Sequence, residues 1–392
     1  MTVYAPSEVK AAHFAPLAVT DYISEVDALR CMAMTGVVAM HCRLLPFGWT
    51  GVWLFYVISG FAITSSLLAS GRTPRPKPLL LRNFYAKRCL RIWPIYFLIV
   101  IPSIIVAAIA GHHIWQEYWP WMVTFTVNYY DIFHYNIGGS NWWFLDHLWT
   151  ISVEEQFYLI FPFLFLFLPR HRLITALGVC IVLGPIFRTL LTQVLNHLPV
   201  DDSFKFGTIC GFAPAHFDAF SAGALLALFR PFLASRLDLA RVFGAIALGA
   251  AVVYICVYMS INVATLGFHQ AALKGVVSHS IWGQGRQIWS YSVIVALGSA
   301  LIALIIAGEG WLLRACRLPF LRPIGRISYG AYIYHLPLLY LYNILTPTLF
   351  PGIPLLGSII QFGFVYPVTL LTAHLSFRFF EEPVLRLRAR FS

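Results

Sequence analysis

The chain has few charged residues for its length. Only 11% of its 392 residues are Asp, Glu, Lys or Arg, whereas 59% are hydrophobic; soluble globular domains carry about 25% charge. A soluble fold of this composition would lack polar side chains for its surface, which indicates that its solvent is lipid. We therefore expect an all-α polytopic membrane protein with short loops and no appended soluble domain.

Other features are absent as well. The seven cysteines include no CxxC pair, which favours buried thiols over disulfides or a metal site. The first 29 residues contain Asp21, Glu25 and Asp27 and no short apolar region before a cleavage site, so we expect an uncleaved anchor instead of a signal peptide. No internal repeat and no Gly/Ser linker divides the chain.

Ten apolar segments are long enough to cross a bilayer. We predict spans at 29–47, 51–69, 91–110, 147–168, 173–192, 214–230, 242–261, 289–307, 328–346 and 354–376. The predicted organisation is a cytoplasmic segment 1–28, a membrane domain 29–378 and a cytoplasmic tail 379–392.

The cations divide unevenly between the two sides of these spans. With the N-terminus in the cytoplasm, 22 of the 27 Lys and Arg lie on inner ends and loops and five on outer ones. Cytoplasmic loops are rich in Lys and Arg, so we expect both termini in the cytoplasm. The formal charge of +11 then reflects contact with anionic membrane lipid, and no nucleic-acid partner is expected.

Charged side chains inside membrane spans are costly, and each is therefore a candidate site. Arg30 and His41 are eleven residues apart in the first span. On a helix this spacing puts them on one face, ~16 Å apart, with Arg30 at the cytoplasmic mouth and His41 deeper. Spacing alone supports equally a functional His41 and a buried, hydrogen-bonded one.

Two further groups of charges stand at the edges of spans. Arg88 and Arg91 are helix neighbours at the start of the third span, where an arginine pair suits phosphate groups or anionic lipid. Glu154 and Glu155 lie several residues inside the fourth span. Because adjacent helical residues point ~100° apart, both glutamates cannot serve one small site equally. One of them could orient a catalytic histidine. The alternative is an ion pair with a structural arginine.

The segment 111–146 is rich in Trp and Tyr and lies outside the membrane in this topology. An interfacial aromatic belt explains such a composition. A platform on which sugar rings stack is the functional alternative.

Taken in order along the chain, these residues resemble the acyltransferase 3 family of integral membrane O-acyltransferases. The matching blocks are Val26–Arg30 with His41, Val52–Thr64, Tyr85–Tyr96, His147–Pro162, Ile324–Pro337 and the Glu-Glu-Pro at 381–383. Tyr56 and Trp93 depart modestly from the family pattern, without affecting the chemistry.

The resemblance implies transfer of an acyl group, often acetyl, from acyl-CoA on the cytoplasmic side to a hydroxyl, with no metal. It implies that Arg30, Arg88 and Arg91 hold the phosphates of acyl-CoA and that His41 is the general base, oriented by Glu154 or Glu155. Residues of second rank, for substrate binding, oxyanion stabilisation or buried hydrogen bonding, are His147, Trp149, Ser152, Tyr329, Tyr332 and His335. We expect direct transfer without an acyl-enzyme.

The acceptor is not defined by these residues. A hydroxyl of an envelope or exported saccharide is favoured, and a macrolide-type or other small natural product is the alternative. Members of the family often carry an extracytoplasmic hydrolase-like domain, which we do not expect here, and the bacterial cytoplasmic (inner) membrane is the expected location. A secondary transporter is the alternative from another class, although transporters usually show internal repeats. A polysaccharide polymerase, which would use a lipid-linked sugar, is a further one.

Overall fold

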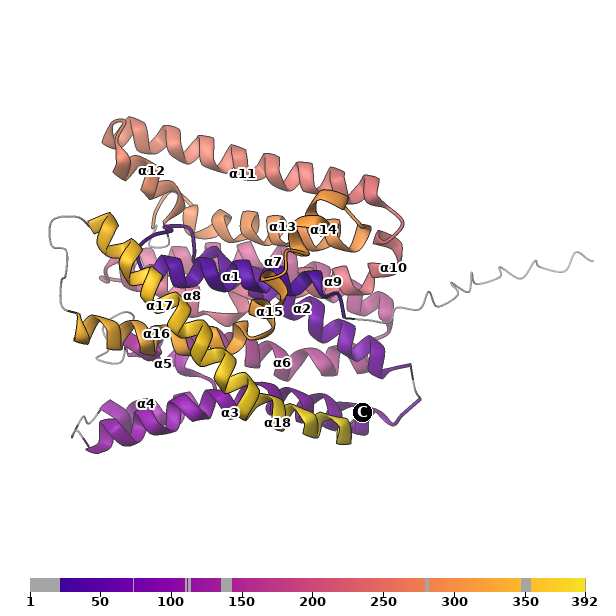
Figure 1. The fold of residues 1–392 in the computed structure, drawn as a ribbon. Coiled ribbons are helices and arrows are strands. Elements are labelled where there is room, and N and C mark those ends of the chain that lie inside the picture. The colour runs from indigo at the N-terminus through magenta and orange to yellow at the C-terminus, as the bar shows by residue number, and fades with distance from the viewer. Residues whose placement is uncertain are drawn as a thin grey trace, which may run out of the picture.

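The computed structural model describes residues 22–391 except 73, 110, 112–113, 135–142, 279–281 and 347–353, and all regular elements within this part are helical. The predicted all-α class is thus confirmed. Long helices run roughly parallel to one axis of the molecule, with α10 and α18 near one end and α4, α5, α8 and α12 near the other (Figure 1).

Eighteen α-helices and four short 3₁₀- or π-helical segments make up the described part. They are α1 Glu25–His41, α2 Thr50–Ser70, α3 Lys77–Ile109, α4 Ile114–Val123, α5 Val127–Phe133, η1 Trp143–Leu148, α6 Trp149–Phe167, α7 Arg170–Asn196, α8 Asp202–Gly211, η2 Ala213–His216, α9 Phe217–Leu228, α10 Arg230–Leu233, α11 Leu237–Leu266, α12 Gln270–Val277, α13 Arg286–Ala307, α14 Gly310–Cys316, α15 Leu321–Arg326, α16 Ser328–Leu345, α17 Pro354–Ser376, η3 Phe377–Glu381, α18 Glu382–Arg386 and η4 Leu387–Phe391.

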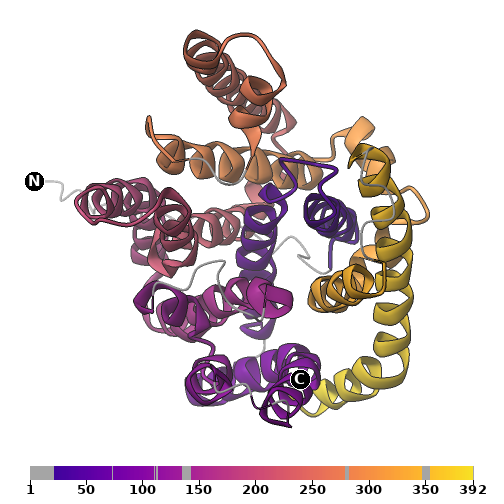
Figure 2. The same ribbon diagram turned by 90° about the vertical axis from the view of Figure 1, so that its left-hand side faces the viewer.

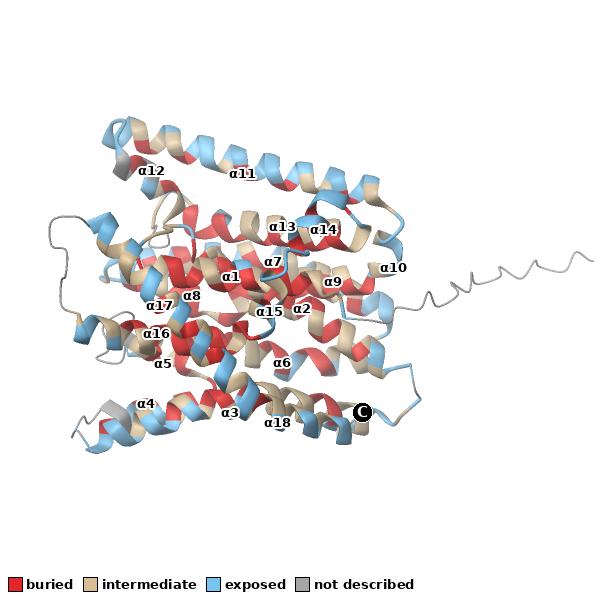
Figure 3. Ribbon diagram, in the orientation of Figure 1, coloured by how far each residue is buried: buried red, intermediate tan, exposed pale blue. Residues whose placement is uncertain are grey.

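Seven helices in the described part are long and apolar enough to cross a membrane, or eight if the bent pair α8 and η2–α9 forms one span. Each of the ten predicted spans coincides with a helix, but α1 and α16, with 17 and 18 residues, are not among the seven. The count of ten and the cytoplasmic position of both termini therefore stay predictions. Much of α11 is exposed (Figure 3). Its exposed side chains include many large apolar ones, as expected for a helix that faces lipid.

Two span edges differ from the prediction in ways that affect the site. The first helix begins at Glu25 and ends at His41, not at residue 47, since Arg43 takes a left-handed conformation with φ 61°. His41 consequently lies at the C-terminal end of α1 instead of deep within it. The third helix begins at Lys77, so the predicted cytoplasmic loop is helical and Arg88 and Arg91 belong to the span helix itself.

The helices α1 and α2 lie near the centre of the bundle, and the others surround them (Figure 2). Two glycines let α2 and α9 touch backbone to backbone. A Cβ atom on Gly60 would stand 1.9 Å from the carbonyl oxygen of Phe220, and one on Gly223 would stand 1.9 Å from that of Val57. Such close contact between small residues is a common way for helices to associate in lipid.

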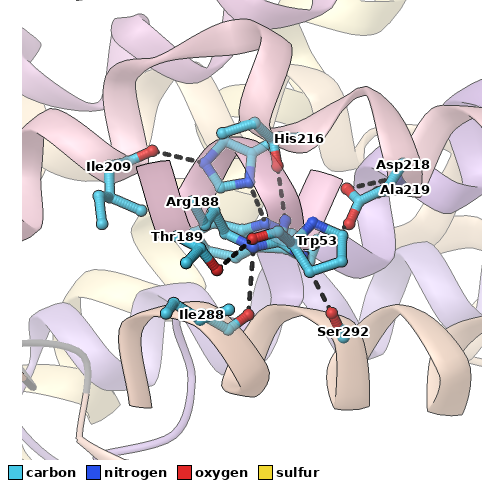
Figure 4. A network of polar contacts seen from close by, with 11 residues as sticks. Trp53, Arg188, Thr189, Ile209, His216, Asp218, Ala219, Ile288 and Ser292 are labelled. Atoms are coloured by element: carbon cyan, nitrogen blue, oxygen red, sulfur yellow. Dashed lines mark hydrogen bonds and ion pairs between the residues drawn. The ribbon is translucent and has the colours of Figure 1, made fainter. Parts of the chain in front are cut away.

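A bend of 73° separates α8 from η2 and α9, and a buried arginine stabilises it. Arg188 of α7 is fully buried and donates to Asp218 Oδ2 (2.9 Å), to the carbonyls of Ala215 (2.5 Å) and Ile288 (3.1 Å) and to Ser292 Oγ (2.9 Å), as Figure 4 shows. One guanidinium therefore joins α7, η2, α9 and α13. Its donors are satisfied, which is the condition for burying such a charge.

The same network reaches α2 through a histidine. Trp53 Nε1 donates to His216 Nδ1 at 3.0 Å, and His216 Nε2 lies 2.8 Å from the carbonyl oxygen of Ile209 (Figure 4). Because that carbonyl can only accept, His216 carries its proton on Nε2 and accepts from Trp53. The bend is thereby linked to the central helix on which part of the site stands.

Candidate active site

Arg30, Arg88 and Arg91 line one cavity of about 1150 Å³. From the sequence we predicted that these three arginines, from separate segments, bind the same ligand. Arg30 comes from α1, and the other two come from α3. The remaining wall is built by α2, α6, the start of α7, the α9–α10 junction and the start of α16. The cavity also contains Glu154, Tyr329 and Tyr332.

Arg30 is held in place by a buried carboxylate. Asp27 is fully buried, and its Oδ1 lies 2.5 Å from Arg30 Nη1. The other oxygen of Asp27 accepts a hydrogen bond from Tyr22, and Arg326 Nε approaches it to 4.0 Å. We assigned Asp27 no role from the sequence, although an acidic residue three positions before an intramembrane arginine is a signal for such a pair.

Arg88 and Arg91 differ from Arg30 because neither forms an ion pair within the described part of the chain. The Arg88 guanidinium lies over the rings of Phe84 and Tyr158, 5.7 and 5.5 Å from their centroids. Two cations without carboxylate partners in the wall of one cavity favour an anionic ligand.

The two adjacent glutamates have different surroundings. Glu154 lines the cavity and accepts a hydrogen bond from Ser59 of α2 at 2.5 Å. Glu155 is not in the cavity wall, and its buried Oε1 has no hydrogen-bond partner among the described residues. Neither carboxylate contacts His41 in the part of the chain described, so the structure does not bring together the predicted histidine–glutamate pair.

His41 instead contacts His335, another predicted residue, which in turn packs against His147. His335 Nε2 lies 3.0 Å from His41 Nδ1, and His335 Nδ1 lies 2.5 Å from the carbonyl oxygen of Tyr332. The His147 ring stands 4.9 Å from that of His335, edge to face, and its Nε2 lies 3.1 Å from the carbonyl oxygen of Ile333. Three imidazoles from α1, η1 and α16 thus form one cluster.

Tyr332 separates this histidine cluster from the cavity. Its hydroxyl lies 2.8 Å from Thr150 Oγ1, and both residues line the cavity. Its ring centroid stands 5.4 Å from that of His335 and 5.3 Å from that of His147. The arginines and the histidines therefore lie on opposite sides of one tyrosine, and Thr150 is a participant that the sequence reasoning missed.

The other residues of second rank are hydrogen-bonded to backbone carbonyls or packed against the core. Tyr329 lines the cavity, and its hydroxyl donates to the carbonyl of Ile92 at 3.0 Å. The buried Ser152 hydroxyl donates to the carbonyl of Leu148 in its own helix at 3.5 Å. Trp149 is half-buried and packs against the core. Neither Ser152 nor Trp149 lines the cavity.

The outer connection predicted at 111–146 contains the short helices α4 and α5, with 135–142 outside the described residues. Tyr118 and Tyr130 pack edge to face at 4.7 Å, and Tyr118 donates weakly to Asp131 at 3.4 Å. Burial and the charge of Asp146 raise the pKa of Asp131 to about 8. Several of these aromatic side chains are therefore packed inside the connection, and whether others bind sugar stays a prediction.

Comparison with known proteins identifies the family of the chain. The acyltransferase domain family matches residues 23–377, and the chain belongs to this family. It is 28% identical to the peptidoglycan O-acetyltransferase OatA of Listeria monocytogenes, over 93% of this chain and 56% of that protein. It is 26% identical to the O-acetyltransferase OatA of Staphylococcus aureus, over 93% of this chain and 57% of the relative. The chain thus spans little more than half the length of these relatives, and no solved structure matches it.

Proposed function

We propose that this protein transfers an acetyl group from acetyl-CoA, entering from the cytoplasmic side, to a hydroxyl of an envelope saccharide. The observation that carries the proposal is the cavity in which Arg88 and Arg91 form no ion pair with any described residue, one tyrosine away from a histidine cluster.

The cavity suits the donor by its charge and depth. The nucleotide end of coenzyme A is polyanionic, and three guanidinium groups can hold its phosphates through charge-assisted, bidentate hydrogen bonds. The acyl group sits at the far end of a thin arm. Arg30 and His41 lie eleven residues apart on one continuous helix, so an arm that follows α1 must reach ~16 Å.

The saccharide acceptor is supported by the relatives. Two of them are named as O-acetyltransferases, and one name specifies peptidoglycan. His41 at the outer end of α1 would meet an acceptor that arrives from the side opposite to the arginines. Peptidoglycan or another envelope saccharide is therefore the acceptor that we propose, in the bacterial cytoplasmic membrane.

The proposed step needs one base and one leaving group. His41 takes the proton of the acceptor hydroxyl as its oxygen attacks the thioester carbonyl. The carbon–sulfur bond then breaks to release the coenzyme A thiolate, which takes up that proton from the His41 imidazolium. An alkoxide does not form unaided at neutral pH, so the base is essential. Glu154 bonds to Ser59 in the cavity wall, which supports a role for it along the path that we propose for the donor.

The test is acetyl transfer by the purified full chain in detergent. Radiolabelled acetyl-CoA is offered with peptidoglycan fragments, neutral oligosaccharides or a macrolide. His41→Ala should abolish labelling of the acceptor, whereas His171→Ala, an exposed histidine on α7, should leave it unchanged. Label retained on the protein after removal of acetyl-CoA would contradict direct transfer.

The outcomes separate the parts of the proposal. A folded protein that does not bind acetyl-CoA would overturn the donor assignment and favour the transporter alternative. Transfer that survives His41→Ala would overturn the base. Transfer to the macrolide alone would overturn the saccharide acceptor.

A further inference from the structure

The histidine cluster makes more hydrogen bonds and ring contacts than a catalytic base alone requires. His335 is fully buried on α16, between the backbone carbonyl of Tyr332 on one side and the half-buried His41 on the other. His147 packs edge to face against its ring. Each contact restricts where protons can sit.

The proton positions follow from what each atom can do. A carbonyl oxygen can only accept, so His335 Nδ1, 2.5 Å from the Tyr332 oxygen, carries a hydrogen. A neutral imidazole has one N–H, which leaves His335 Nε2 as an acceptor. The 3.0 Å contact between His335 Nε2 and His41 Nδ1 then requires the hydrogen on His41 Nδ1.

A positively charged His335 would donate from Nε2 and so reverse its hydrogen bond with His41. The surroundings of His335 oppose that charge. A buried imidazolium requires a carboxylate or equivalent partner. Among the described residues, the titratable side chains that contact His335 are His41 from α1, His147 from η1 and Tyr332 from its own helix, and none of these three is a carboxylate. The neutral form is therefore the one that fits.

We propose that His335 is a positioning residue, which holds His41 as the Nδ1–H tautomer and so leaves His41 Nε2 as the atom that takes the acceptor's proton. The inference rests on the proposed function, in which His41 is the base. It replaces Glu154 and Glu155 as the orienting group with a neutral imidazole. The chain of hydrogen bonds ends at the Tyr332 carbonyl, which cannot take up a proton, so the abstracted proton stays on His41 until the coenzyme A thiolate takes it up.

Two substitutions at one position separate the contacts. In His335→Gln the amide oxygen can reach the place of Nε2 and accept from His41, whereas in His335→Asn the shorter amide can donate to the Tyr332 carbonyl but loses His41. We expect His335→Asn to lower kcat roughly 10- to 100-fold, less than the full contribution of a general base, with KM for acetyl-CoA within about twofold of wild type. His335→Gln should restore most of that loss.

Two further readouts separate positioning from simple packing. The acidic limb of the kcat profile, which reports protonation of His41, should move to lower pH in His335→Asn because the imidazolium loses its hydrogen-bond acceptor. In wild-type protein, ¹⁵N NMR of labelled histidine, assigned by difference from His41→Asn, should show a protonated Nδ1 and an unprotonated Nε2 on His41.

The outcomes distinguish this inference from the proposed function. A wild-type protein without transferase activity sinks the proposed function, while the NMR measurement still decides the tautomer. A protonated His41 Nε2, or a His335→Asn variant with wild-type kcat and pH profile, overturns the role of His335. If His335→Asn fails to bind acetyl-CoA, it is misfolded, and His335→Gln and the NMR measurement decide.

Discussion

Substitution of Arg88 by Gln separates binding of the donor from stability of the fold. Arg88 makes no ion pair in the described part of the chain; its guanidinium lies over two aromatic rings, and it shares the cavity with the like charges of Arg30 and Arg91. Cation–π contacts at such sites contribute roughly 0.5–1 kcal/mol. Loss of repulsion offsets part of this, so we expect the unliganded Arg88→Gln protein to unfold at nearly the wild-type temperature.

The effect on the donor should be much larger. A hydrogen bond to a charged group contributes about 1.5–3 kcal/mol, and about 1.4 kcal/mol corresponds to a tenfold change in Kd. The Kd for acetyl-CoA should therefore rise roughly 10- to 150-fold, measured by titration calorimetry in the detergent used for thermal unfolding. Wild-type affinity should also fall with added salt, since phosphate contacts are screened.

The matched control is Arg314→Gln, an exposed arginine that does not line the cavity. It should change neither the Kd nor the unfolding temperature. An Arg88→Gln protein that unfolds early while keeping its affinity for acetyl-CoA would refute the reasoning, because it would show that Arg88 supports the fold and not the ligand.

Three other predictions concern stability. Arg188→Met should lower the free energy of unfolding by about 3–5 kcal/mol, since it leaves the carboxylate of Asp218 buried without its partner. Adding Asp218→Asn should recover part of this loss, measured as unfolding midpoints. Equal losses in the single and double variants would argue against the pair. The raised pKa of Asp131 means that its contribution to stability is complete below pH ~4 and is lost as pH rises through about 8, by at most ~1.4 kcal/mol per pH unit. Asp131→Asn should flatten the dependence of unfolding midpoint on pH between these limits, and parallel curves for the two proteins would contradict the assignment. Gly60→Ala should destabilise by about 1–3 kcal/mol through the forced separation of α2 and α9, whereas Gly178→Ala, with nothing within 4 Å of the added carbon, should be neutral in the same thermal assay.

The arginine-lined half of the candidate site could be predicted from the sequence. Arg30, Arg88 and Arg91 each stand at the edge of an apolar segment, and hydropathy places these edges on the same side of the membrane. The structure puts all three in one cavity. Helical spacing likewise predicted that Glu154 and Glu155 could not serve one site equally, and only Glu154 lines the cavity.

The half that contains the histidine cluster could not be predicted, because it depends on contacts between distant helices. Hydropathy does not show that the backbone turns at Arg43 and leaves His41 at a helix end. Nor does it show that His335, 294 positions away, lies beside His41. A search for a carboxylate to orient the histidine therefore led to Glu154 and Glu155, since an acid is the commoner partner and spacing says nothing about a second imidazole.

The buried arginine of α7 has a consequence for how the chain is made. Arg188 finds its partners on Asp218, Ala215, Ile288 and Ser292, 27 to 104 residues later in the sequence. When α7 leaves the ribosome none of these residues has been synthesised, and an arginine inside a lipid-facing helix is costly to insert, by roughly 2.5–3.5 kcal/mol at the helix centre and by less toward its ends. We therefore expect α7 to remain beside the insertion machinery, or to keep Arg188 hydrated, until α9 and α13 arrive. Completion of the membrane domain would then be a late and concerted event, and a chain truncated before residue 286 should leave α7 poorly inserted.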